Sequence, residues 1–252
     1  MMLSRRAFLR STVSALALPT AWRCGSGFTE PGLGNPRLSA RPGQPTLRPA
    51  TGYTALELGS ARDGYLWVPV GYSALTAAPL VVALHGAGQS ADFWASYRNR
   101  ADTRGFVLLV PESRGATWDV VTGGFGPDVA FIDDALAFAF ASCRIDPARI
   151  ALAGFSDGAS YALSLGVSNG DLFTHLIAYS PGFLRATDPV VGKPPVFISH
   201  GTDDPILSYP NTRDGLVPRL QREGYSVTFE SFEGGHSVPA AISEKALDWF
   251  YS

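Results

Sequence analysis

Residues 151–160 read ALAGFSDGAS and place a single serine, Ser156, between Gly154 and Gly158, directly after an apolar run. Two interpretations fit this stretch. It is either a loose turn of small residues or a strand-to-helix turn so tight that only glycine fits beside it. In the second case Ser156 has strained backbone angles and its hydroxyl projects from the end of a sheet, an arrangement called a nucleophile elbow. One G-x-S-x-G match is common by chance, so the rest of the chain has to decide.

The surrounding sequence predicts an α/β fold with a mostly parallel central sheet and helices on both faces. From Tyr53 onward, short apolar runs alternate with helical patterns, and no insertion is long enough for a sizeable cap domain. An opening antiparallel pair is predicted at YTALELGS and GYLWVPV. The runs expected to be strands covered on both faces are PLVVALHG, GFVLLVPE, RIALAGFS, HLIAYSPG, PPVFISHG and SVTFESFE.

Helical periodicity appears between and after these runs. One helix is expected to begin with Asp128 as its N-cap, and its apolar face carries Ile132, Ala135, Leu136, Ala139 and Cys143. Cys143 is therefore expected to be a core residue and not a reactive thiol. The last helix tolerates Pro239 in its first turn, and its apolar stripe is formed by Ile242, Ala246, Trp249 and Phe250.

Residues 1–24 are predicted to be an export signal. A basic start is followed by a mildly apolar stretch that is too short for a bilayer span, which needs about 20 apolar residues. The pair Arg5-Arg6, with Phe8 and Leu9 after it, resembles the twin-arginine signal that exports folded bacterial proteins. We therefore expect a periplasmic or secreted protein.

The end of this segment allows two interpretations. Cleavage is expected near Ala17 to Ala21. Cys24 would alternatively be a lipid-anchored cysteine, but Trp22 and Arg23 before it are bulkier than that signal tolerates. Residues 25–52, rich in Gly, Pro and Ser and without apolar periodicity, are predicted to be a flexible linker. Residues 53–252 are then the catalytic domain.

Composition excludes several classes of partner and site. A chain of 252 residues with 46% hydrophobic and 17% charged residues is long enough for one sizeable core. The formal net charge of −2 and the lack of a basic run give no reason to expect nucleic acid. Two cysteines exclude a disulfide framework or cysteine-rich zinc site, and no pair of the four histidines has helical metal-ligand spacing.

The partners of Ser156 are predicted from chain order. A serine hydroxyl needs a base to take its proton, and the base needs a carboxylate to orient it. In this architecture the acid and then the histidine follow later strands. FISHGTDDPIL supplies an acid just after an apolar strand, and FEGGHSVP supplies His236 after the last strand. We therefore expect the interpretation of Ser156 as a nucleophile to be the right one.

The segment ALHGAGQSA, residues 83–91, is predicted to complete the site. Its glycines allow a tight backbone that turns an N–H toward the serine, so the two oxyanion donors are expected to be the backbone amides of Ala87 and Asp157. His85 and His200 each precede a glycine at a strand end and are expected to be buried histidines that bond loop backbone. His175 is given no role.

Together, LHGAGQS, IDPARIALAGFSDGASYAL, HGTDDPIL and GGHSVP resemble the α/β-hydrolase superfamily from about Leu80 to the C-terminus. More narrowly they resemble the phospholipase/carboxylesterase group and the polyhydroxybutyrate-depolymerase-like esterases. Asp157 stands where the carboxylesterase group often has Gln, which places the chain nearer the depolymerase-like side. The resemblance implies a triad of Ser156, Asp204 and His236, with no metal or organic cofactor.

The choice of Asp204 over Asp203 has two supports. In the resembling families the motif reads His-Gly-x-x-Asp-x-x-Val, which assigns the acid to Asp204, with Leu207 in place of Val. Consecutive side chains in extended backbone point to opposite sides, so only one of the pair reaches His236. Pro205 favours an extended Asp204, and Asp203 is expected to face solvent or cap the turn.

These observations predict a serine hydrolase that cleaves small or polymeric carboxylic esters. A thioesterase or peptidase on the same scaffold is one alternative, because the triad does not choose between these bonds, and a non-catalytic binding protein is another. Gln89, Trp118 and Phe125 are predicted to contact substrate, and Phe93 and Trp94 lie near the same loops. The alternative role of these aromatic residues is core packing.

Overall fold

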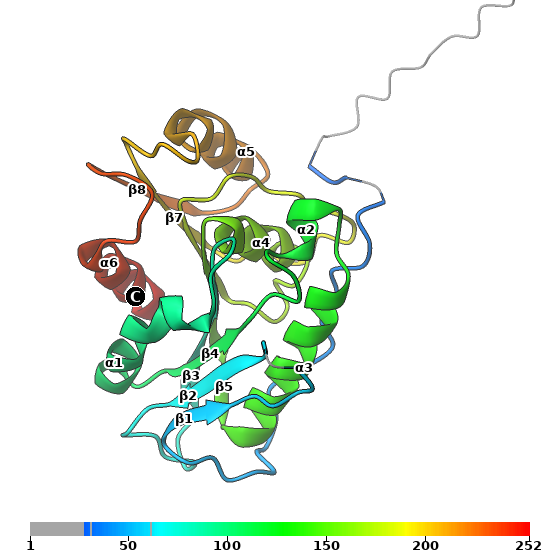
Figure 1. Cartoon of the computed structure of the whole chain (residues 1–252), viewed down its shortest axis with the longest axis vertical. Coiled ribbons are helices and arrows are strands. Elements are labelled where there is room, and N and C mark those ends of the chain that lie inside the picture. The colour runs from blue at the N-terminus through cyan, green and yellow to red at the C-terminus, as the bar shows by residue number, and fades with distance from the viewer. Residues whose placement is uncertain (1–27, 31, 61) are drawn as a thin grey trace, which may run out of the picture.

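The computed structural model describes residues 28–30, 32–60 and 62–252, shown as a ribbon in Figure 1. The predicted signal segment and Cys24 lie outside the described residues. Within these ranges the runs expected to be strands are all strands: β1 Gly52–Ala55, β2 Gly64–Val68, β3 Ala78–Leu84, β4 Val107–Pro111, β5 Ile145–Phe155, β6 His175–Tyr179, β7 Val196–Gly201 and β8 Val227–Phe232.

The eight strands of the described ranges form one sheet in the order β1-β2-β4-β3-β5-β6-β7-β8. β1 and β2 pair antiparallel, as predicted, and β2 joins β4 in the same way. All pairings from β4 through β3 and on to β8 are parallel. Because parallel strands end at the same edge, the loops that follow β3, β5, β7 and β8 gather on one side of the molecule.

Helices cover both faces of this sheet (Figure 1). α1 and α6 lie on one face, and α2, α3 and α4 lie on the other. Their bounds are α1 Ala95–Arg104, α2 Asp119–Thr122, α3 Pro127–Ser142, α4 Asp157–Gly166, α5 Val217–Arg222 and α6 Ala240–Tyr251, with single-turn helices η1 at Ala91–Trp94 and η2 at Asn211–Leu216. No further domain is inserted between the strands of residues 62–252, and the mostly parallel sheet flanked by helices is the predicted fold class.

The central strand β3 shows why these runs are apolar throughout. Leu80, Val82 and Leu84 point into the core on the α3 and α4 side, while Val81 and Ala83 point into the core on the α1 and α6 side. All five side chains are fully buried. Successive strand residues face opposite sides, so a strand covered on both faces needs an uninterrupted apolar run.

The capping of α3 differs from the prediction. The Asp128 carboxylate accepts hydrogen bonds from the backbone N–H groups of Arg114 at 2.6 Å and Asp119 at 2.7 Å, so it supports the preceding loop. The N-terminus of α3 is instead satisfied by Asp119, whose Oδ2 accepts from the N–H groups of Gly126 and Asp128 at 2.8 and 2.9 Å. The two carboxylates thus tie α2 and α3 together, a pairing across nine residues that local capping rules do not anticipate.

The described part of the predicted linker at residues 25–52 comprises residues 28–30 and 32–51, which we call the N-terminal strap, and it is not the flexible segment that its composition predicted. The strap runs beside α3 (Figure 1) and packs against the domain. Its buried side chains include Phe28, Leu33 and Leu38, which belong to the core on the α3 and α4 side. Its backbone is also paired, since Asn169 Oδ1 accepts from the N–H of Leu38 at 2.9 Å. The strap therefore extends the α/β domain at its N-terminal end.

Two smaller expectations about the core are confirmed. Cys143 is fully buried, and burial raises the pKa of its thiol to about 12, so it is not a reactive cysteine. In α6, Ile242, Ala246 and Phe250 of the predicted stripe are buried and Trp249 is half-buried, whereas Pro239 is not in the first turn but precedes the helix as its N-cap. None of the helices in the described part of the chain is long and apolar enough to cross a membrane.

Candidate active site

Ser156 occupies the junction between β5 and α4. Its backbone angles are φ 57° and ψ −119°. Residues other than glycine rarely adopt a positive φ. The backbone at this point is held from the neighbouring strand, because the Ser156 N–H donates to the carbonyl of Tyr179 at 2.9 Å. The sheet therefore maintains the strained backbone of this turn. Of the two structures that the sequence allowed, the loose turn and the tight strand-to-helix turn, the structure has the tight one.

The glycines on either side of Ser156 are required by close backbone contact. A Cβ at Gly154 would collide with the carbonyl of Gly158, and a Cβ at Gly158 would collide with the carbonyls of Leu84 and His85. The first turn of α4 thus lies directly against the ends of β5 and β3. Without side chains at these two positions, the chain turns sharply enough to lift the serine above the sheet.

The structure brings Ser156, His236 and Asp204 into one hydrogen-bonded chain. His236 Nε2 lies 2.8 Å from Ser156 Oγ, and His236 Nδ1 lies 2.6 Å from Asp204 Oδ2. An ionised carboxylate only accepts, so the Nδ1 proton points to Asp204 and Nε2 is left free to accept the serine proton. The three side chains come from the ends of β5, β7 and β8, in the order expected from the sequence.

Asp204 and its neighbour Asp203 have different surroundings. The Asp204 carboxylate is fully buried, and its Oδ1 accepts from the N–H groups of Ile206 at 2.8 Å and Leu207 at 2.9 Å. Burial alone would raise its pKa, but the Leu207 N–H, the His236 ring and the Ile206 N–H outweigh burial and lower the pKa below its ordinary value. Asp203 is exposed, with its carboxylate near its own neighbour Thr202 at 3.4 Å.

Two backbone N–H groups are available near Ser156. Those of Ala87 and Asp157 donate no hydrogen bond within the described part of the chain. Ala87 follows Gly86, where a Cβ would approach the Ser156 Cβ to 3.3 Å. Asp157 is the first residue of α4, so its N–H is one of the unpaired donors at a helix N-terminus. Both groups can stabilise a negative oxygen beside the serine.

The loop after β3 is held by a hydrogen bond within it and by another to the loop after β4. Gln89 Oε1 accepts from the N–H of Gly86 at 2.9 Å, and the N–H of Gly88 donates to the carbonyl of Ala116 at 2.7 Å. On the other side of the serine, Thr117 Oγ1 donates to the Asp157 carboxylate at 2.7 Å. The sequence analysis did not identify Thr117, because no local pattern links a hydroxyl in that loop to α4.

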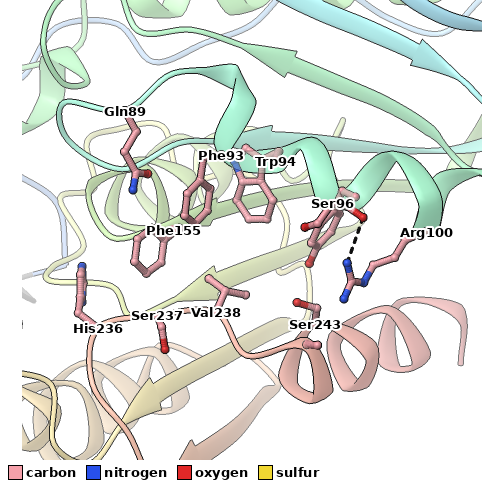
Figure 2. Close-up of a pocket in the computed structure, with 12 residues that line it drawn as sticks. Gln89, Phe93, Trp94, Ser96, Arg100, Phe155, His236, Ser237, Val238 and Ser243 are labelled. Atoms are coloured by element: carbon pink, nitrogen blue, oxygen red, sulfur yellow. Dashed lines mark hydrogen bonds between the residues drawn. The ribbon is translucent and has the colours of Figure 1, made fainter.

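A cavity of about 370 Å³ opens beside His236. Figure 2 shows Phe93, Trp94 and Phe155 along one side and Ser237 and Val238 along the other, in the direction of Ser243 and Arg100. The Phe155 ring lies 4.7 Å from the His236 ring and 4.8 Å from the ring of Phe93, nearly parallel to it. The cavity therefore has an aromatic wall that begins at the histidine.

The predicted substrate residues separate into two groups. Gln89 lines this cavity. Trp118 and Phe125 do not line it, and the prediction that they contact substrate is wrong. Both are buried in the core on the α3 and α4 side, where their rings pack on Tyr161 at 5.1 and 5.9 Å. The indole N–H of Trp118 donates a hydrogen bond to the carbonyl of His85 at 2.8 Å, so it is not available to a substrate.

The remaining histidines are placed as follows. His85 is fully buried; its Nδ1 lies 2.7 Å from the Gly86 carbonyl, and its Nε2 accepts from the N–H of Ser113 at 3.1 Å. His175 begins β6, at the end of the sheet away from Ser156. His200 Nε2 lies 3.0 Å from the Leu207 carbonyl and also 3.1 Å from Asp204 Oδ2, a contact that the sequence did not indicate.

Residues 64–206 match the family model described as esterase PHB depolymerase. The chain belongs to this family. The matched range covers β2 through β7, including Ser156 and Asp204, and it stops before His236. Family membership agrees with the resemblance inferred from the sequence motifs.

Curated relatives from fungi share part of the chain. A bifunctional acetylxylan esterase/xylanase of Neocallimastix patriciarum is 28% identical over 165 residues, which are 61% of this chain and 23% of that protein. Feruloyl esterase B of Thermothelomyces thermophilus is 31% identical over 126 residues, 46% of this chain and 43% of that protein. The chain thus spans less than half the length of these relatives.

Solved structures show the same fold. The crystal structure of esterase PE8 covers 75% of this chain and 97% of its own, with a TM-score of 0.58 and 23% identity. An acetyl xylan esterase from Aspergillus awamori covers 74% of this chain and 93% of its own, with a TM-score of 0.56 and 16% identity. These similarities establish the α/β-hydrolase fold, and the chemistry is inferred from the site itself.

Proposed function

We propose that this member of the esterase PHB depolymerase family is a serine hydrolase of carboxylic esters. The observation that carries the proposal is the hydrogen-bonded chain from Ser156 Oγ through His236 to Asp204, with distances of 2.8 and 2.6 Å. The unpaired N–H groups of Ala87 and Asp157 beside the serine support it. A base, its orienting acid and an oxyanion site at one serine are the parts that acyl transfer requires.

In the first half-reaction, His236 Nε2 takes the proton from Ser156 Oγ as this oxygen attacks the ester carbonyl. The carbonyl oxygen becomes negative and is held by the N–H groups of Ala87 and Asp157. Asp204 keeps the His236 ring in the tautomer that accepts at Nε2 and stabilises the imidazolium. When the tetrahedral intermediate collapses, His236 donates its proton to the departing alcohol and the acyl group stays on Ser156.

The second half-reaction repeats these steps with water. His236 removes a proton from a water molecule, whose oxygen attacks the acyl carbon in the same oxyanion site. The carbon–oxygen bond to Ser156 breaks, Ser156 Oγ takes the proton back from His236, and the carboxylic acid leaves. The protein's own side chains supply every proton transfer, so the cycle ends with the starting enzyme.

We propose that the cavity beside His236 receives one arm of the ester. Its volume of about 370 Å³ exceeds the space that an acetyl group needs, and its aromatic wall of Phe93 and Phe155 favours an apolar or aromatic group. The amide nitrogen of Gln89 is unpaired within the described ranges and is available to a polar group of the substrate. The names of the curated relatives refer to acetyl and feruloyl esters, and we carry over only the broader class, carboxylic esters.

Two measurements test this proposal. A fluorophosphonate probe should label the purified protein, and mass spectrometry should place the label on Ser156, because only an activated serine reacts rapidly. A panel of p-nitrophenyl esters from acetate to palmitate, with a feruloyl ester and a polyester, should show turnover. The matching thioester and anilide of one acyl group should be slower. Failure of both labelling and ester turnover would mean that the fold serves binding alone.

We further propose that Arg5-Arg6 directs export through a twin-arginine signal. Because a receptor reads the arginine pair itself, changing it to Lys-Lys should keep the protein in the cytoplasm while leaving the mature domain active. Cell fractionation of both versions measures this. Equal periplasmic amounts of the two proteins would contradict the proposal.

A further inference from the structure

We propose that His200 is a positioning residue for the triad, a second imidazole that donates its Nε2–H to the carboxylate of Asp204. The inference rests on the proposed ester hydrolysis and adds a residue to it. His200 touches neither Ser156 nor a substrate. It acts through Asp204, by fixing the oxygen that faces His236.

The contact is built into the end of β7. His200 and Asp204 both have side chains with no exposed surface, and His200 Nε2 lies 3.1 Å from Asp204 Oδ2. The same nitrogen lies 3.0 Å from the carbonyl of Leu207. One ring nitrogen thus faces two oxygens that belong to the two ends of the short loop carrying the acid.

These two oxygens determine where the ring proton is. With the proton on Nδ1, Nε2 would present a lone pair to a carboxylate and a carbonyl, both electron-rich, inside the protein. With the proton on Nε2, the N–H donates to the Leu207 carbonyl and its positive end also faces the Asp204 carboxylate, 3.1 Å away. His200 Nδ1 makes no hydrogen bond within the described residues, in agreement with this tautomer. Burial also lowers the pKa of the ring, so His200 stays a neutral donor near neutral pH.

Asp204 is consequently held at both oxygens. Oδ1 accepts from the N–H groups of Ile206 and Leu207, whereas Oδ2 accepts from His236 and has His200 Nε2 3.1 Å away. Without His200, Oδ2 would have one partner and the carboxylate could rotate about its side-chain bonds. Since the His236 ring is aligned by this same oxygen, looser control of Asp204 would misalign the base with Ser156.

Two substitutions separate positioning from packing. His200→Phe keeps a ring but removes the donor, and His200→Gln restores an N–H donor near the position of Nε2. His175→Phe is the matched control, because it alters a histidine at the opposite end of the sheet. We would measure kcat and KM for a p-nitrophenyl ester, the pH profile of kcat/KM, the rate of fluorophosphonate labelling and the urea midpoint of each protein.

We expect kcat of His200→Phe to fall by about tenfold to a hundredfold, the loss that small misplacement of a catalytic group causes, with KM nearly unchanged. The acidic limb of its pH profile should move to higher pH, because Asp204 without the second donor attracts a proton onto His236 more strongly. His200→Gln should recover most of kcat and the position of the limb. His175→Phe should keep the wild-type kcat and profile.

Other outcomes would overturn the inference. Unchanged kcat in His200→Phe would show that Asp204 needs no second donor. An equal loss in the Phe and Gln variants with an unmoved pH profile would show that His200 acts only through packing. An inactive, unlabelled wild-type protein would refute the proposed function itself, which keeps the two failures apart.

Discussion

The turn at residues 154–158 and the N-terminal strap at residues 28–30 and 32–51 are both rich in small residues, yet the structure uses them differently. In the turn, each glycine lies against backbone: Gly154 against Gly158, and Gly158 against the end of β3. In the strap, Gly32 and Gly43 have open space where a Cβ would stand, and only Gly34, against the carbonyl of Phe125, resembles the turn glycines. The strap is instead held by its apolar side chains and by paired charges.

This comparison separates two kinds of loop that composition alone does not distinguish. The turn requires glycine at positions 154 and 158, because neighbouring backbone atoms occupy the volume that a Cβ would need. The position of the strap on the domain is stabilised by the burial of its apolar side chains and by the ion pairs of its charged side chains. Substitutions in the turn should therefore affect chemistry or folding severely, whereas most substitutions in the strap should have small and graded effects on stability.

The largest effect should come from Ser156→Ala. Ester turnover should fall by roughly four to six orders of magnitude, the range found when triad members are removed. The urea midpoint should stay close to that of the wild type, because the turn depends on its glycines and not on the hydroxyl. Turnover and unfolding measured on the same preparation test this. More than a percent of wild-type activity would remove Ser156 as the nucleophile.

The next effect distinguishes the two neighbouring acids. Asp204→Asn should lower kcat by about 10⁴-fold, because an amide favours the wrong tautomer of His236. Asp203→Asn is the matched control and should cost far less, since the Asp203 side chain is exposed and has no contact with the ring. Steady-state kinetics of both variants decide the matter. A crippled Asp203→Asn beside a nearly normal Asp204→Asn would reverse the assignment.

Two glycine substitutions test the comparison directly. Gly158→Ala should lower the free energy of unfolding by about 3 kcal/mol or more, as backbone must shift to admit the methyl group. Gly43→Ala should leave it unchanged or raise it by up to about 1 kcal/mol, because its site is open and the unfolded chain loses freedom. Urea unfolding gives both values. Similar behaviour of the two variants would mean that the turn is not as closely packed as its contacts indicate.

A smaller effect than that of Gly158→Ala should come from a charge that holds the strap against the domain. Asp171 Oδ2 lies 2.9 Å from Arg37 and 2.6 Å from Arg41, and the hydrogen bond from Arg37 is the main cause that lowers the pKa of Asp171 below its ordinary value. These side chains are about a third exposed, so Asp171→Asn should cost only about 0.5–1 kcal/mol at pH 7.

The pH dependence of this cost has a definite sign. A lowered folded-state pKa stabilises the fold fully above the pKa of the unfolded chain, about 3.9 for Asp, and this contribution is lost as pH falls toward the folded-state value. The difference between wild type and Asp171→Asn should therefore be constant from pH 7 to about pH 5 and narrow below about pH 4. Urea unfolding across this range checks it. A difference that widens in acid would contradict the assignment.

Sequence reasoning succeeded where a property is local or follows chain order. The strands were predicted because a strand buried on both faces must be apolar throughout, as β3 is. Asp204 was preferred to Asp203 from alternation along extended backbone and from the resemblance. The errors concern distant contacts. Trp118 stands on a loop near the site, but its ring turns into the core against Tyr161. The strap looked like a linker because its four buried side chains are too irregularly spaced to form a periodic pattern.

By itself, then, the sequence determined the order of the strands along the chain, the turn at Ser156 and the residues available as base and acid. Tertiary structure alone decided that the strap packs on the domain, that Asp119 and not Asp128 caps α3, and that His200 reaches Asp204. The physical reason is the range of the interactions. Backbone angles and strand burial are set by residues a few positions apart, whereas these contacts exist only after the sheet has brought distant segments together.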